Sequence, residues 1–119
     1  MPPNPLDLSH KAILDSLLLK IPGVTAGDIV GLLAYFINEK MFACIWNGGV
    51  GIRISPSEAE NLQSSTGNVA PFQPKGINRT SEWILIKHEN SQDYKKDLEI
   101  FKSSIEYAKV RRAGTTNYQ

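Results

Sequence analysis

The sequence is poor in the residues that bring disulfides, metals and membranes into a fold. Cys44 is its only cysteine in 119 residues, which excludes an intramolecular disulfide and a cysteine-rich zinc site. No apolar run approaches the ~18 residues that span a bilayer, and the first residues lack the basic and apolar regions of a signal peptide. We therefore expect a cytoplasmic protein without a membrane partner.

An excess of charge of one sign is also missing. Thirteen Lys and Arg residues face twelve Asp and Glu residues, so the net charge of +1 argues against a nucleic-acid partner. The composition, 41% hydrophobic and 21% charged, is that of a globular chain. We expect one domain over residues 8–113, with flexible ends at 1–7 and 114–119.

Apolar spacing and turn residues predict the secondary structure. Asn38-Glu39 and Asn47-Gly48 separate three β-branched or aromatic runs, and Ser55, Pro56 and Glu58 form a helix start. The predicted elements are a helix at 8–20, strands at 29–37, 41–46 and 50–54, a helix at 55–64, strands at 69–72 and 83–87, and a helix at 92–112. This order, α-β-β-β-α-β-β-α, predicts a two-layer α+β fold: an antiparallel sheet with helices mainly on one face.

Groups that could support catalysis are few and scattered. Cys44 lies among apolar neighbours in a strand, which favours a protonated, packed thiol. His10 and His88 have no second ligand at metal-binding spacing, so both are interpreted as ordinary surface or helix-end histidines. A pairing of Cys44 with His88 is conceivable in space, but nothing in the sequence requires it. We expect no catalytic residues, no metal and no cofactor.

The Asn47-Gly48 hairpin allows the two faces of the sheet to be assigned. A two-residue loop pairs Trp46 with Gly49 and Ile45 with Val50, and the alternation then separates the side chains. The face beneath the helices receives Met41, Ala43, Ile45, Val50, Ile52 and Ile54. The opposite face receives Leu33, Tyr35, Phe42, Cys44, Trp46, Gly51 and Arg53. A face away from the helices is normally polar, so this aromatic patch implies a cover.

Several covers fit the sequence. The chain's own helix or its proline-rich N-terminus is one, and a second copy of the chain, a foreign protein or a small ligand are the others. The candidate interaction residues are Leu33, Tyr35, Phe42, Trp46 and Arg53. A three-residue turn would reverse the assignment of faces.

A series of short stretches carries a family resemblance. They are Ile21 to Thr25, Gly31 to Ala43, Ile52-Arg53, Pro56 to Glu60, Pro71-Phe72 and Glu82 to Ile86. In this order, across residues 8–112, the series resembles the TfoX N-terminal domain family, named for regulators of natural competence. Ile29-Val30-Gly31-Leu32 departs from the Met-Phe-Gly-Gly of that family, and Asn38-Glu39 from its Asn-Gly turn. The resemblance implies a stand-alone α+β domain without the C-terminal domain of the regulators and without established catalytic residues.

The sequence thus favours a non-enzymatic binding or regulatory module that acts through protein contacts, with another protein or a second copy as partner. The alternative is a domain that binds a small ligand or nucleic acid in a basic cleft near Arg53, Lys75 and Arg79.

Overall fold

The computed structural model describes residues 5–29, 31–46, 48–72 and 82–110. The helices are α1 (Pro5–Leu18), α2 (Pro56–Ser65) and α3 (Leu98–Val110), with a 3-10 helix, η1 (Ser91–Asp97), before α3. The strands are β1 (Val24–Ile29), β2 (Leu32–Ile37), β3 (Lys40–Trp46), β4 (Gly49–Arg53), β5 (Val69–Pro71) and β6 (Trp83–Ile86). Of the ends predicted to be flexible, residues 1–4 of the segment 1–7 and all of 114–119 lie outside the described residues.

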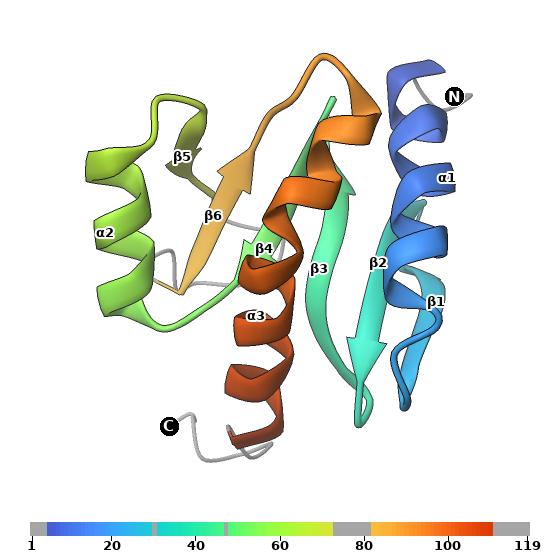
Figure 1. Ribbon diagram of the computed structural model, residues 1–119. Helices are drawn as coiled ribbons and strands as arrows, with labels where there is room; N and C mark the ends of the chain where they lie inside the picture. Colours follow the sequence, from blue (N-terminus) through green and yellow to red (C-terminus); the bar gives the residue numbers. More distant parts are fainter. Residues whose placement is uncertain (1–4, 30, 47, 73–81, 111–119) are drawn as a thin grey trace.

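The strands form one antiparallel sheet in the order β1-β2-β3-β4-β6-β5. The helices lie on one side of it, with α1 and α3 in front of the central strands and α2 beside β5 and β6 (Figure 1). The predicted two-layer α+β fold is therefore confirmed.

Local signals place the start of α2 as predicted. The Ser55 hydroxyl accepts a hydrogen bond from the Glu58 backbone N–H, and Pro56 occupies the first helical position. The start of α1 is different, because the helix begins at Pro5 inside the segment expected to be flexible. There the Asp7 carboxylate accepts the Gly48 N–H at 2.7 Å and ties the first turn to the β3–β4 connection.

The structure contains a strand, β1, that the spacing of apolar residues in the sequence does not predict. Most residues of β1 are exposed, so the strand lacks the apolar alternation of a half-buried strand. The Asp28 carboxylate accepts the Gly31 N–H at 2.6 Å, and Gly31 has a φ of +85°. A positive φ is disfavoured for residues that carry a side chain, and glycine adopts it in the β1–β2 turn without that steric cost.

Two apolar clusters lie on the two faces of the sheet. The larger cluster joins residues of α1, α2 and α3 to the helix-facing side chains of the strands. The smaller one contains buried Ala34, Cys44 and Trp83, with partly buried Leu32, Phe36, Met41 and Phe72 against them. We call the sheet face that carries this smaller cluster the back face.

Candidate interaction surface

A bulge in β3 decides which side chains reach the back face. The β3–β4 register is as predicted, with Trp46 opposite Gly49 and Ile45 opposite Val50. Between β2 and β3, however, Tyr35 faces Ala43 while Phe36 faces Met41. Phe42 is thus an extra residue in β3, and an extra residue reverses the alternation of everything beyond it.

Three of the five predicted interaction residues are consequently on the helix side, so their assignment to the opposite face is wrong. Phe42 is fully buried in the larger cluster. Tyr35 is buried there too, and its hydroxyl donates to the Asp15 Oδ1 of α1 at 2.6 Å. Leu33 packs against the same cluster. Met41, predicted beneath the helices, moves in exchange to the back face beside Phe36.

Trp46 keeps its predicted place on the back face. It is 49% exposed, and its ring lies 6.4 Å from that of Phe72. Phe72 also meets Trp83 edge to face, with ring centroids 6.1 Å apart. A Cβ atom built on Gly51 would be 2.6 Å from the Phe72 Cδ2 atom, so Phe72 lies directly over the glycine. The chain itself therefore covers part of this face, and a glycine within a strand is the sequence signal of such close approach.

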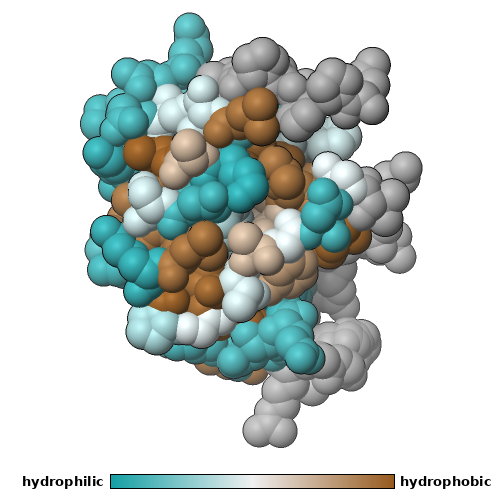
Figure 2. Space-filling view, turned by 90° about the vertical axis from the view of Figure 1, so that its right-hand side faces the viewer, coloured by the Kyte–Doolittle hydropathy of each residue, from teal (hydrophilic) through white to brown (hydrophobic). Residues whose placement is uncertain are grey.

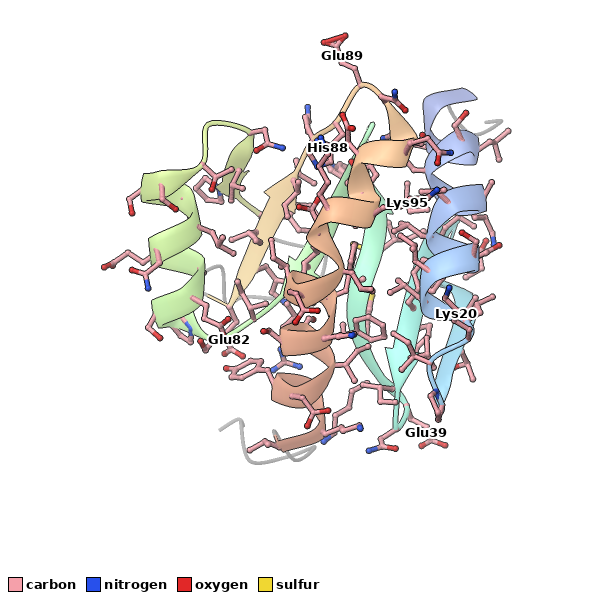
Figure 3. The ribbon with its side chains drawn as sticks, in the orientation of Figure 1. Lys20, Glu39, Glu82, His88, Glu89 and Lys95 are labelled. Carbon is pink, nitrogen blue, oxygen red and sulfur yellow. The ribbon has the colours of Figure 1, made fainter. Side chains whose placement is uncertain are left out.

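Arg53, the fifth predicted residue, is part of an ion pair. Its Nη2 atom lies 3.0 Å from the Oε1 atom of Glu82, which is 2% exposed. The Tyr107 hydroxyl donates to the same oxygen at 2.9 Å, and the guanidinium lies 5.8 Å from the Tyr107 ring centroid. Figure 3 shows Glu82 between the lower ends of α2 and α3. The charge of Arg53 is thereby balanced within the domain, while Lys75 and Arg79 of the predicted basic cleft lie outside the described residues.

His10 is not the surface or helix-end histidine that the sequence predicts. It is fully buried, and Nε2 lies 3.0 Å from the Gly48 carbonyl oxygen. Nδ1 lies 2.7 Å from the Ser91 hydroxyl, so a neutral ring that donates from Nε2 accepts the serine proton. Burial lowers the pKa of His10, although the Gly48 bond and the Asp7 charge oppose the shift. The ring therefore pins α1 to the β3–β4 connection and to η1.

His88 also contacts Tyr94: the imidazoles of His88 and His10 both meet the tyrosine ring edge to face, at centroid distances of 4.6 and 4.7 Å. Its Nε2 atom is 2.7 Å from Asp97 Oδ2, and Figure 3 shows it in the connection after β6. Burial raises the pKa of Asp97, against the opposing effect of His88. Cys44 belongs to the back-face cluster instead, and burial raises its pKa to about 12. The predicted packed thiol is confirmed. His88 packs against Tyr94 of the larger cluster, whereas Cys44 belongs to the smaller one.

The sheet has two edges of very different character. β5 is three residues long and ends in Pro71, two features that hinder the addition of a strand. β1 is six residues long, pairs with β2 without a register shift and contains neither lysine nor proline. Asp28 is its one charged residue, and the carboxylate is turned toward Gly31. Within the described residues no strand covers the outer side of β1, so this edge is open to backbone pairing.

An exposed apolar side chain lies on the open edge. Ile29, at the end of β1, is 45% exposed. Figure 2 views the molecule from the side of α1 and β1 and shows separate hydrophobic areas among hydrophilic side chains. The edge thus offers both backbone groups and apolar contact area to a partner.

No family model matches the chain, and no curated protein matches it. Across the described ranges, no three His, Cys, Asp or Glu side chains are grouped so that they could hold a metal ion. In the same ranges, no helix has the length and apolar character needed to cross a membrane.

Proposed function

We propose that this domain is a non-enzymatic protein-binding or regulatory module and that its binding element is the open edge of β1. The observation that carries the proposal is the contrast between the sheet edges: β5 is short and ends in proline, whereas β1 is longer and, in the part of the chain that the structure describes, has no strand on its outer side. An extended segment of a partner gains backbone hydrogen bonds at such an edge and contacts alternate side chains for specificity.

The pairing of β1 with β2 tells which backbone groups are available. Ile29 faces Leu32 across a two-residue loop, and such a closing pair exchanges both of its hydrogen bonds. Residues that bond to β2 alternate along β1 with residues that do not. Gly27 and Thr25 therefore also bond to β2, while Ala26 and Asp28 point their N–H and C=O groups away from it. The Val24 N–H supports this phase, because it bonds to the Ile21 carbonyl rather than to β2. Ala26 and Asp28 are therefore the backbone donors and acceptors that a partner strand would use.

The partly covered back face is the competing surface, and Trp46 is its most exposed large side chain. The pairing of Arg53 with Glu82 argues against a basic ligand or nucleic-acid cleft at Arg53. The resemblance to the TfoX N-terminal domain family and the cytoplasmic location remain part of the proposal.

A pull-down from extract of the source cell can separate the edge from the back face. Ala26→Pro removes an outward N–H without removing a bond to β2, and Ala26→Ser is the matched control that keeps the N–H. Trp46→Glu alters the back face. We expect a specific partner, either another protein or the cell's own copy of this chain, to be retained by the wild type, Ala26→Ser and Trp46→Glu and lost with Ala26→Pro. Retention by Ala26→Pro together with loss by Trp46→Glu would place binding on the back face and refute the edge.

A further inference from the structure

We infer that the partner at the β1 edge is a second copy of this chain, paired antiparallel about a two-fold axis at Gly27. The inference rests on the proposed function, because it uses the same open edge. Two identical chains related in this way bring the same edge of each together and satisfy both at once. The result is one continuous sheet across the dimer.

Symmetry restricts the register of this pairing. Only a two-fold axis perpendicular to the sheet relates two adjacent antiparallel strands, and it keeps the helices of both copies on the same side. Directly opposite residues of two antiparallel strands point their side chains to the same face of the sheet. The axis must therefore lie midway between one residue and the same residue of the second copy. Ala26 and Gly27 are the central residues of β1, so each defines one register.

The side chains favour the register centred on Gly27. It places Thr25 opposite Ile29 of the second copy, so the exposed isoleucine gains a β-branched cross-strand neighbour. It also pairs Ala26 with Asp28 of the second copy, and these are the residues whose backbone groups point outward. The register centred on Ala26 would leave Ile29 unpaired and put Asp28 opposite Val24, which is buried in the apolar core.

Charge and packing allow this approach. The two Asp28 residues are diagonal neighbours about 7–8 Å apart rather than directly opposite, and each carboxylate already accepts the Gly31 N–H of its own turn. At the axis, Gly27 contributes no side chain between the strands. The bond from Tyr35 to Asp15 anchors α1 over β2, one strand inward from the edge. Asp28 is thus the one charged residue of β1 itself, and its carboxylate is engaged by its own turn.

Sedimentation equilibrium of the purified chain over a range of concentrations tests the dimer. We expect the mass to reach twice the 13.2 kDa of the chain for the wild type and for Ala26→Ser, and to stay at 13.2 kDa for folded Ala26→Pro. A wild type that stays monomeric at all concentrations overturns the inference, as does a dimer that persists in Ala26→Pro. A monomer that still loses its partner protein with Ala26→Pro in the pull-down leaves the proposed function standing.

Disulfide crosslinking tests the register separately. Thr25 and Ile29 of the second copy form a non-hydrogen-bonded pair with Cα atoms about 4.5 Å apart, within the range that a disulfide bridges. The double variant Thr25→Cys with Ile29→Cys should therefore run as a covalent dimer without reductant. Each single variant should form no covalent dimer under the same conditions, because its two introduced cysteines lie far apart along the strands, and Cys44 is buried. Failure of the double variant to crosslink, or equal crosslinking of the single variants, overturns the register.

Discussion

Adding one methyl group at Gly51 tests how the back face is closed. A Cβ atom at this position would lie 2.6 Å from Phe72 Cδ2 and 3.0 Å from Cys44 Sγ. The Phe72 ring would have to move, while the buried Cys44 has little room to do so. Overpacking of this kind costs about 1–3 kcal/mol of unfolding free energy. We expect Gly51→Ala to lose stability by that amount, although alanine by itself suits a strand better than glycine.

Urea unfolding followed by tryptophan fluorescence measures the effect, and Gly67→Ala is the matched control. A Cβ atom at Gly67 would meet nothing within 4 Å, so this variant should be neutral or slightly more stable. Phe72→Ala destabilises through the lost contacts with Trp46 and Trp83, but it also opens the space above Gly51.

The cost of Gly51→Ala should therefore be smaller in the Phe72→Ala background, with a remainder from the Cys44 contact. A double-mutant cycle gives this coupling directly, and neighbours in contact couple by about 0.5–3 kcal/mol. Equal costs in the two backgrounds would show that Phe72 does not lie over Gly51. A Gly51→Ala variant as stable as the wild type would refute the close approach altogether.

Three further predictions concern buried polar groups. Tyr35→Phe removes the hydroxyl bond to Asp15 and should cost about 1–3 kcal/mol in urea unfolding, so an unchanged midpoint would contradict that bond. The Cys44 thiol, with a pKa of about 12, should react with a thiol reagent at pH 8 far more slowly in the native protein than in urea, and equal rates would contradict its burial. Burial lowers the pKa of His10 from 6.5, so on acidification the unfolded chain binds a proton at a higher pH than the folded protein does. The free energy of unfolding should therefore fall as the pH drops below about 6.5, by at most about 1.4 kcal/mol per pH unit. His10→Gln should remove the contribution of His10 to the dependence of stability on pH, and an unaltered dependence in this variant would refute the assignment. The raised pKa of Asp97 acts in the opposite direction at lower pH.

Features that depend on a few neighbouring residues were predictable from the sequence. Ser55, Pro56 and Glu58 fix the start of α2 through a cap that the structure contains. The spacing around Asn47-Gly48 predicts the pairing of Trp46 with Gly49, and the apolar neighbours of Cys44 predict its buried thiol. These predictions hold because a turn, a helix cap or the register of a hairpin depends on residues that are close together in the sequence.

The interaction surface depended on tertiary structure instead. No local pattern marks Phe42 as a bulge, yet that one extra residue sends Leu33, Tyr35 and Phe42 to the helix side and Met41 to the back face. The burial of His10 likewise requires Gly48 and Ser91, which are distant in sequence.

The sequence by itself determined an α+β domain with a hairpin at its centre, because its turns and caps are local. Only the tertiary structure decided that β1 forms an open edge, because an exposed edge strand needs no apolar alternation and is defined by its pairing with β2.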